Sequence, residues 1–485
     1  MDGTDGSARR DEAIDSNARL AFPHAAPAAT PAVMTEPPRS TAVALLCWTV
    51  ILGVVVGLAV VHERRERAAA ARATTSAAAE GPRFELLVAG RAAVAVGQMA
   101  STTDALRQQL RTAVVGLAIR PVDRLAAATV VRELAGPAAA VRQLDEDPAI
   151  TGASPRLRGD GAALSAAYRA DSATVLSEDQ RADLARDLGY FGRLAVTQGR
   201  GADPAARRAV LAEGRRTWVV TTAATAAAVA GLAVGLLGLV GVVVLFGLGT
   251  LRFGYVVPAG RGTVWLETFA VWLVMFVGVS LAASRLPLHL SLVASEGVMA
   301  VMTAGVAVGW PAWRAGLSFD DVRWTLGWHR GRGVMAELAC GLLGYVAGLP
   351  VVALGFGLTA VLIRLSGSHP SHPIEQSFGE NMAAPHVLAL LTAAAVLAPL
   401  LEETVFRGAL YAHLRRGHGA WVSTVVVSLL FAAIHPQGWT TIPVLGSIAA
   451  ELAFLREWRG SLIAPMTAHA LNNGVLVLIV ALALG

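Results

Sequence analysis

Three charged residues close together near the C-terminal end stand in an otherwise apolar stretch. Glu402, Glu403 and Arg407 lie in or beside the apolar run of residues 384–410. Charges inside a membrane span are costly, so they are usually paired or functional. On a helix, Glu403 and Arg407 are four residues apart and share one face, where an ion pair can form. Glu402 points about 100° away from Glu403. It lacks this partner, which makes it a candidate general base.

Two later apolar runs supply polar groups that a hydrolytic site needs. His435 ends one run, and the last run contains His469 and Asn473, four residues apart. One helix face can therefore present an imidazole and an amide together. Peptide hydrolysis needs a base that takes a proton from water and donors that stabilise the oxyanion. Glu402 with His435 can provide the base, and His469 with Asn473 can provide the donors.

A metal-dependent mechanism uses some of the same residues. Glu402, His435 and His469 are side chains that bind Zn²⁺, and three such ligands leave a fourth position for water. No run carries the paired-histidine helix of common zinc peptidases, so we favour a metal-free mechanism, with Zn²⁺ or another divalent metal as the alternative. Cys47 and Cys340 both lie in apolar runs. They offer neither a disulfide framework nor a cysteine zinc site.

Together these motifs resemble those of the type II CAAX endopeptidases, the CAAX prenyl protease and bacteriocin-processing family of intramembrane metalloproteases. The three motifs occur in order as Glu402-Glu403 with Arg407, Phe431 with His435, and His469 with Asn473. The resemblance covers about residues 384–484. It implies an intramembrane endopeptidase in which Glu402 and His435 activate water while His469 and Asn473 hold the oxyanion. Glu403, Arg407 and Phe431 would then support the site.

Two other functions are compatible with these residues. The chain could be a non-catalytic membrane protein of the same fold, such as a bacteriocin-immunity or transport accessory protein. Glu402 and the histidines could also form a proton relay in a transporter, but the halves of the chain show no inverted repeat. The full motif set favours the peptidase. Its expected partners are a peptide or protein substrate at the membrane and the lipid bilayer, with no nucleic acid. The substrate, its prenylation and the oligomeric state cannot be read from the sequence.

The composition around these motifs is that of a membrane protein. The 485 residues are 54% hydrophobic and 15% charged, and the mean hydropathy is +0.55. Soluble domains of this length seldom reach such values. Most apolar runs approach or exceed the roughly 20 residues that cross a bilayer. They cover residues 41–61, 218–249, 264–283, 290–309, 334–363, 384–410, 420–435, 441–455 and 461–484. We expect an all-α, polytopic transmembrane helix bundle of about nine spans in a bacterial plasma membrane.

The runs divide the chain into four regions. Residues 1–40 are polar and read as a disordered leader. Residues 41–61 form a transmembrane anchor, since no clear signal-peptide cleavage site follows them. Residues 62–216 are rich in Ala, Arg, Asp and Glu with helical spacing, which predicts an extramembrane helical domain between the first two spans. Residues 217–485 form the multi-span membrane domain, with the peptidase core at about 384–484.

Arginine in the short loops predicts the orientation. Alternate loops hold Arg252 and Arg261, then Arg314, Arg323, Arg330 and Arg332, then Arg415 and Arg416, then Arg456 and Arg459. The opposite side has little beyond Arg285 and Arg364. Because short cytoplasmic loops gather arginine, we expect the N-terminus inside and residues 62–216 outside. Arginines that flank the long domain point the other way, but long segments translocate largely regardless of charge.

The expected depths of Glu402 and His435 in the membrane conflict with a shared site. If the seventh run begins near Ala420, His435 lies about 22 Å along its helix at 1.5 Å per residue. Glu402 stands late in the run of residues 384–410 and is therefore expected nearer the other surface. A tilted helix, or one that begins inside the bilayer, would reconcile the two positions.

Overall fold

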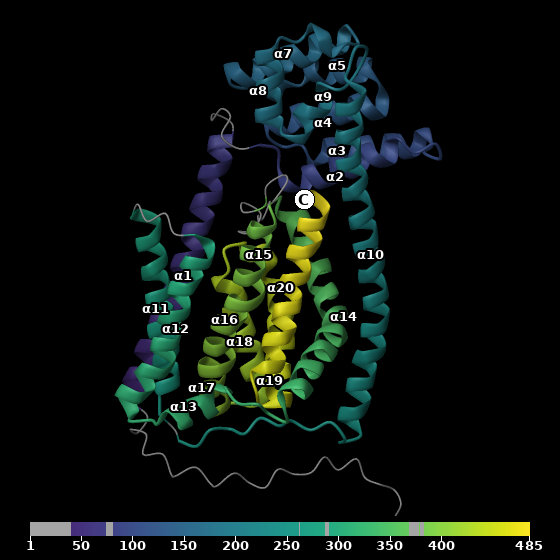
Figure 1. Cartoon of the computed structure of the whole chain (residues 1–485). Coiled ribbons are helices and arrows are strands. Elements are labelled where there is room, and N and C mark those ends of the chain that lie inside the picture. Colours follow the sequence, from purple (N-terminus) through teal and green to yellow (C-terminus); the bar gives the residue numbers. More distant parts are fainter. Residues whose placement is uncertain (1–39, 74–80, 261, 287–290, 368–377, 379–382) are drawn as a thin grey trace, which may run out of the picture.

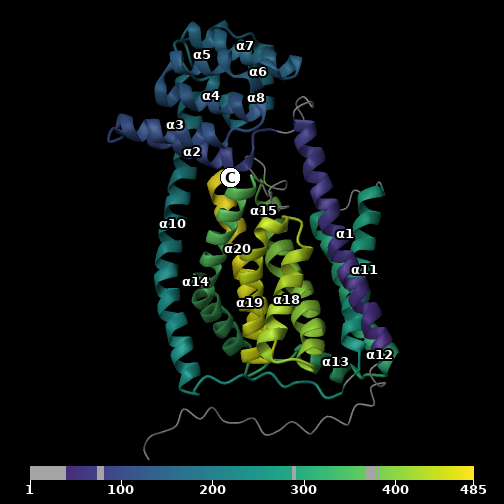
Figure 2. The same cartoon turned by 180° about the vertical axis from the view of Figure 1, so that it is seen from behind.

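The protein is all-α throughout the part of the chain that the structure describes. This computed structural model describes residues 40–73, 81–260, 262–286, 291–367, 378 and 383–485. Within these ranges no strand is present, and isolated bridges join Ser172 to Gly199 and Arg200. The predicted leader, apart from its last residue, lies outside the described residues. The helices form two parts, a bundle of long helices and a group of shorter ones at one end (Figures 1 and 2).

The bundle helices follow the predicted apolar runs. They are α1 (Thr41–Ala73), α10 (Pro204–Gly247), α11 (Val264–Arg285), α12 (Leu292–Ala315), α14 (Val334–Ser366), the segmented helix Ala384–Arg415, α18 (Ala420–Ile434), α19 (Ile442–Arg459) and α20 (Ile463–Leu484). Within the described residues, seven are long and apolar enough to cross a membrane. The other two are α18, with 15 residues, and α19, with 18 residues that include four charged ones. These features make the chain a multi-pass membrane protein.

Shorter helices build the domain that the sequence predicts to be extramembrane. They are α2 (Phe84–Gly97), α3 (Asp104–Leu117), α4 (Pro121–Ala135), α5 (Pro137–Glu146), α6 (Pro148–Thr151), α7 (Pro155–Arg169), α8 (Glu178–Leu188) and α9 (Tyr190–Ala195). Five helices of the described chain between residues 121 and 247 begin with a proline in their first turn, where its missing N–H costs no hydrogen bond. Leu125, Val130 and Phe191 lie in the shared core. The predicted domain of residues 62–216 thus includes the ends of two long helices, because α1 runs to Ala73 and α10 begins at Pro204.

A pair of buried carboxylates lies in this domain, outside the membrane-spanning helices. Asp160 of α7 is 6% exposed and Asp187 of α8 is 8% exposed. Arg156 forms an ion pair with Asp187. Burial, and then the negative charge of Asp187, raise the pKa of Asp160 to about 7, and the charge of Asp183 acts in the same direction. Asp160 therefore keeps its proton at mildly acidic pH.

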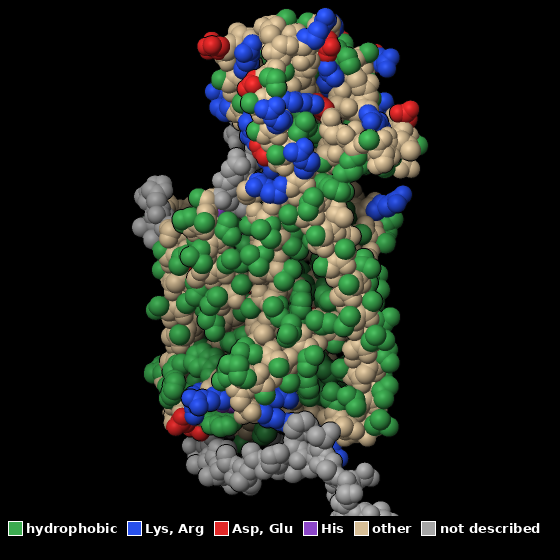
Figure 3. All heavy atoms as spheres, turned by 45° about the vertical axis from the view of Figure 1, so that its right-hand side comes forward, with side chains coloured by type: hydrophobic (Ala, Val, Ile, Leu, Met, Phe, Trp, Pro, Cys, Tyr) green, Lys and Arg blue, Asp and Glu red, His purple; other side chains and the backbone are tan. Residues whose placement is uncertain are grey.

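The arginine-rich loops lie at one end of the bundle. The loops after α10, α12, α17 (Tyr411–Arg415) and α19 are at the end opposite to the extramembrane domain (Figure 1). Figure 3 shows basic side chains gathered at that end, below a largely apolar belt. Five arginines predicted to lie in loops belong to helices instead: Arg314 to α12, Arg323 to α13 (Phe319–Leu326), Arg415 to α17, and Arg456 and Arg459 to the last turn of α19. The side chains of Arg456 and Arg459 are also buried. Which side of the membrane this end faces stays a prediction.

Aromatic packing holds the C-terminal helices together around the predicted site. The ring of Phe406 meets those of Phe269 on α11 and Phe431 on α18 edge to face, with centroids 5.1 Å apart in each case. Ala449 of α19 belongs to the same buried cluster. These contacts bring the segmented helix, α18 and α19 against one another, while α20 packs along the segmented helix and α14.

Candidate active site

The two adjacent glutamates lie where the helix Ala384–Arg415 is irregular. Glu402 and Glu403 end α16 (Ala398–Glu403), which separates two π-helical segments, η3 (Ala393–Leu397) and η4 (Thr404–Leu410). Pro399 in the first turn of α16 has no N–H to donate to the preceding turn, which favours an irregular turn there. π-Helical turns inside α-helices are rare and are often found at functional sites.

Glu403 and Arg407 form the ion pair that their spacing predicts. Arg407 Nη1 lies 2.9 Å from Glu403 Oε1, and both side chains are fully buried. Arg407 Nη2 donates to the carbonyl of Ala449 at 2.9 Å. The guanidinium also lies over the ring of Phe431, 4.7 Å from its centroid. This pair therefore ties the segmented helix to both α18 and α19.

His469 lies between the two glutamates, which the sequence did not indicate. Its Nδ1 is 2.9 Å from Glu403 Oε1, and its Nε2 is 3.8 Å from Glu402 Oε2. The imidazole is buried, with 4% of the residue exposed. Glu403 thus contacts two basic groups, Arg407 and His469, from different helices. No spacing rule reveals the second contact, because the residues are 66 positions apart.

Glu402 differs from Glu403 in its surroundings. Its side chain is 28% exposed. Its Oε2 is buried and has no hydrogen-bond partner among the described residues, which is also true of Glu403 Oε2, so the difference between the two glutamates lies in exposure and in the contact with Arg407. The sequence predicted that Glu402 would lack the ion-pair partner of its neighbour, and the structure agrees. A partly exposed carboxylate can accept a proton from a bound water.

His435 joins the site through Phe431 rather than through Glu402. Its Nδ1 lies 2.6 Å from the carbonyl oxygen of Phe431, and its ring lies against the Phe431 ring at a centroid distance of 4.4 Å. Phe431 also meets His469 edge to face at 6.2 Å. Because a carbonyl only accepts, Nδ1 carries a proton, and in the neutral form of the ring Nε2 is then an acceptor.

The conflict of depth disappears because the sixth helix is longer than predicted. It continues to Arg415, so Glu402 lies thirteen residues from its end, roughly 20 Å at 1.5 Å per residue. His435 follows the last residue of α18, which starts at Ala420, about 22 Å along its axis. The short turn between these helices puts both starting points at the same end of the bundle, so the two residues reach similar depths.

Asn473 lies one helical turn beyond His469 on the same helix. Its Nδ2 donates to the carbonyl oxygen of Ala394 at 2.8 Å, inside the π-helical segment η3. This contact fixes the orientation of the amide and uses one of its two N–H bonds. The other N–H remains available to a bound group. The donor role predicted for Asn473 is compatible with this geometry.

The proposed metal ligands are only partly assembled. His469 Nε2 and Glu402 Oε2 face each other at 3.8 Å, and Glu403 holds the other ring nitrogen as an outer carboxylate commonly does for a ligating histidine. Across the described part of the chain, however, no three His, Cys, Asp or Glu side chains gather as ligands of a metal ion would. The set of Glu402, His435 and His469 does not form a metal site in this arrangement. Metal binding stays a prediction.

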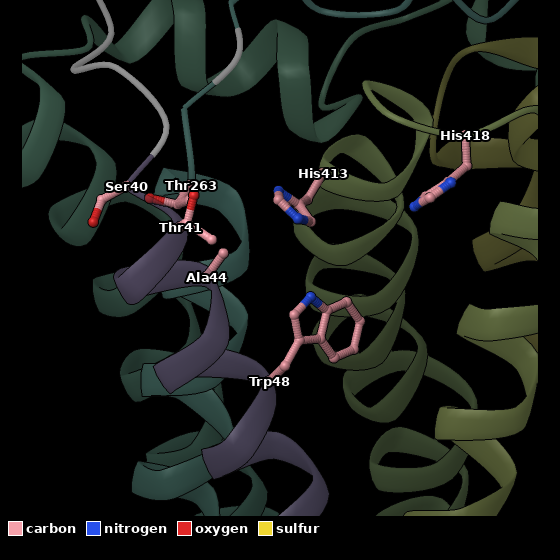
Figure 4. A pocket seen from close by; sticks show the side chains of 7 residues that line it. All are labelled: Ser40, Thr41, Ala44, Trp48, Thr263, His413 and His418. Carbon is pink, nitrogen blue, oxygen red and sulfur yellow. The ribbon is translucent and has the colours of Figure 1, made fainter.

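A separate pocket lies at the arginine-rich end of the bundle (Figure 4). Its volume is about 240 Å³, and it is lined by Ser40, Thr41, Ala44, Trp48, Thr263, His413 and His418. These residues belong to the start of α1, the start of α11 and the region around α17. No residue of the predicted catalytic set lines this pocket.

Comparison with known proteins agrees with the family resemblance that the motifs indicate. Residues 384–475 match the family described as type II CAAX prenyl endopeptidase Rce1-like. The chain is 32% identical over 114 residues to the uncharacterized protein YpbD of Bacillus subtilis strain 168, covering 22% of this chain and 54% of that protein. It is 29% identical over 128 residues to an uncharacterized 24.3 kDa protein of Escherichia coli, covering 26% of this chain and 57% of that protein.

The chain thus spans about half the length of these bacterial relatives. No solved structure matches it. The matched segment contains the glutamates, the arginine, both histidines and Asn473. It leaves the extramembrane domain and most of the other membrane helices without a counterpart.

Proposed function

We propose, on the premise that residues 384–475 form an Rce1-like type II CAAX prenyl endopeptidase domain, that this chain is an intramembrane endopeptidase. It would hydrolyse peptide bonds in or near a bacterial plasma membrane. The observation that carries the proposal is the position of His469, which contacts Glu403 and faces Glu402. A buried imidazole between two carboxylates, one of which is partly exposed and can act as the general base, is an arrangement suited to acid–base chemistry.

Glu402 and His435 would activate the attacking water. The unused oxygen of Glu402 accepts a proton as the water oxygen adds to the scissile carbonyl carbon. Nε2 of His435 is an acceptor when Nδ1 donates to Phe431, so it can orient the same water. The proton then moves to the leaving amine as the carbon–nitrogen bond breaks. The products are a new carboxylate and a new amine.

His469 and Asn473 would stabilise the oxyanion. Both ring nitrogens of His469 donate only in the imidazolium, and its positive charge balances the group, since Glu402 and Glu403 then face Arg407 and His469. A neutral sum is favourable in a low-dielectric site. Nε2 of His469 and the second N–H of Asn473 are the two donors that can meet the developing negative charge.

The shorter helices also fit a membrane site. α18 and α19 stand side by side between α14 and α1 in Figure 2, alongside the longer helices. We place both within the membrane, which gives the nine membrane helices that the apolar runs suggest. Their connection, residues 435–441, then lies below the outer membrane surface. His435 at the start of this turn is thereby held at the depth of Glu402.

The test begins with finding a substrate. Quantitative proteomics of membranes from cells that contain the wild type or Glu402→Gln should reveal proteins cleaved only by the wild type. Such a protein, purified in detergent, should be cleaved by the wild type and not by Glu402→Gln, because the amide keeps the size of the side chain but cannot accept the proton. Glu451→Gln is the matched control, since Glu451 is another glutamate of the bundle, on α19.

The outcomes separate the possible functions. Turnover retained by folded Glu402→Gln would refute the general base. Cleavage by neither protein, with both correctly folded, would favour a non-catalytic immunity or transport accessory protein. A chelator that stops cleavage, together with stoichiometric metal that is lost in His469→Ala, would replace the metal-free mechanism by a metal-dependent one.

A further inference from the structure

Arg456 is a fully buried guanidinium that no carboxylate pairs among the described residues. It lies in the last turn of α19 and is 1% exposed. Its Nε donates to the carbonyl of Arg407 at 3.0 Å, and its Nη2 donates to the carbonyl of Thr325 at 2.9 Å. Its Nη1 donates to the carbonyl of Gly460. The guanidinium also lies over the ring of Tyr255, 4.8 Å from its centroid.

Arg459, on the same helix, has its positive charge compensated by a carboxylate. Arg459 Nε and Nη2 contact the carboxylate of Glu337 on α14 at 3.0 and 2.7 Å. Removing a charge from water is costly unless an opposite charge and hydrogen bonds compensate. Arg459 has that opposite charge in direct contact. The direct contacts of Arg456 are main-chain carbonyls and an aromatic face, and the adjacent Glu457, which pairs with Arg415, attracts it only at longer range. A charge placed at such cost in a membrane protein indicates a functional need.

The carbonyls that Arg456 binds belong to the segments that carry the candidate site. Arg407 lies in η4, four residues after Glu403. Gly460 lies in the turn that leads from α19 into α20, the helix of His469. Arg456 therefore connects the backbone beside Glu403 to the start of the helix that brings His469. Both segments also rest on α13 (Phe319–Leu326), whose Thr325 supplies the third carbonyl.

The backbone of α13 packs closely against the Arg456 guanidinium, with no space for a side chain at Gly327. Gly327, which ends α13, has a φ of +89°, and a Cβ at this position would lie 2.3 Å from Nη1 of Arg456. The carbonyl of Gly327 also accepts from the N–H of Leu462, the residue before α20, at 3.0 Å. Glycine is required here both for its left-handed conformation and for the close approach. The guanidinium is thus held in one place from several sides.

We propose that Arg456 is a positioning residue that fixes the contact of 2.9 Å between Glu403 and His469. It does so by holding η4 and the start of α20 at a set separation. Its effect on catalysis depends on the proposed peptidase function, whereas its effect on the position of His469 does not. The inference can therefore be tested with and without a substrate.

The central variant is Arg456→Lys. Lysine keeps the charge and a long stem, but its single nitrogen cannot reproduce the fixed fork of guanidinium donors to three carbonyls. Arg459→Lys is the matched control, because it makes the same change three residues away in a buried ion pair. In Gly327→Ala, the new methyl group on α13 would push the same guanidinium out of place. This variant therefore replaces Arg456→Lys as the test if Arg456→Lys does not fold.

Two measurements are made on the full-length protein in detergent. The first is the ¹⁵N NMR signal of the His469 ring nitrogens, assigned through its loss in His469→Gln. The second is the rate of cleavage of the substrate found by proteomics. Arg456→Lys should shift the His469 signal and lower kcat by about 10²-fold, since a displacement of about 1 Å can have this effect. KM should stay nearly unchanged, and Arg459→Lys should alter neither quantity.

Each outcome is decisive. If Arg456→Lys leaves the His469 signal unchanged, the positioning role is refuted, whatever the activity. If Arg459→Lys has the same effects as Arg456→Lys, both arginines act only on the stability of the bundle, and the role is again refuted. The wild type could also cleave no substrate, while Arg456→Lys or Gly327→Ala still shifts the His469 signal. In that case the positioning role stands and the proposed function fails.

Discussion

Removal of the Glu403 carboxylate tests whether Arg407 depends on it for folding. Arg407 is fully buried, and its Nη1 contacts Glu403 at 2.9 Å. In Glu403→Ala the guanidinium keeps the Ala449 carbonyl but loses its counter-charge. Breaking a buried ion pair in this way costs about 3–5 kcal/mol, out of a typical free energy of unfolding of about 5–15 kcal/mol. His469 also loses its acceptor. The yield of folded protein should therefore fall strongly.

The assay compares folded yield and thermal unfolding after size-exclusion chromatography in detergent. The double variant Glu403→Ala, Arg407→Ala should recover part of the loss, because no unpaired charge then remains in the core. It should stay below the wild type, since His469 still lacks its acceptor. Glu451→Ala is the control, because Glu451 is a half-buried glutamate on α19 that forms no ion pair with a described residue. A double variant that is no more stable than Glu403→Ala would refute the reasoning.

Three further outcomes are expected. Asn473→Ala should lower kcat by about 10²–10³-fold with KM nearly intact, because its free N–H meets negative charge only in the transition state. Steady-state kinetics on the identified substrate checks this, and a rise in KM alone would contradict it. Asp160, whose ordinary pKa is 3.8 and whose folded pKa is about 7, should stabilise the extramembrane domain below about pH 4 and lose this effect as the pH rises through 7. The loss amounts to at most about 4 kcal/mol, because the folded state holds a proton that the unfolded chain releases. In Asp160→Asn, hydrogen exchange in α7 should lose this pH dependence, and an unchanged profile would exclude Asp160 as its source. A cysteine at Ala138, on α5 of the extramembrane domain, in a cysteine-free background should react with an impermeant maleimide added to intact cells. Labelling only after lysis would reverse the predicted orientation.

Helix positions were predictable because they depend on local composition. The run of residues 420–435 became α18 (Ala420–Ile434), and the last run became α20 (Ile463–Leu484). The sequence analysis did not predict helix starts whose first turns are polar. The run predicted from residue 218 belongs to α10, which begins at Pro204 with Asp203 as its cap, because an apolar run does not report the polar turns that precede it. The boundary drawn at residue 216 therefore falls inside one continuous helix.

The same distinction applies to the candidate site. The pair of Glu403 and Arg407 follows from a spacing of four residues and was predicted. The bond from Asn473 to the Ala394 carbonyl was not, since it forms with a carbonyl in the π-helical segment η3. The buried state of Arg456 was missed as well, because its carbonyl partners come from α13, η4 and the turn before α20. Contacts between helices depend on packing, and no periodicity along one segment encodes them.

The adjacent glutamates show how the fold gives one residue type two roles. Glu403 is fully buried and contacts both Arg407 and His469, so its negative charge is compensated and serves to hold other groups. Glu402, turned by about 100°, remains 28% exposed and lacks the arginine contact of Glu403, although each glutamate has one oxygen without a hydrogen-bond partner among the described residues. A partly exposed carboxylate can reach a bound water, whereas a carboxylate enclosed by two basic side chains cannot. Loss of Glu403 should therefore affect folding first, whereas loss of Glu402 should affect chemistry alone.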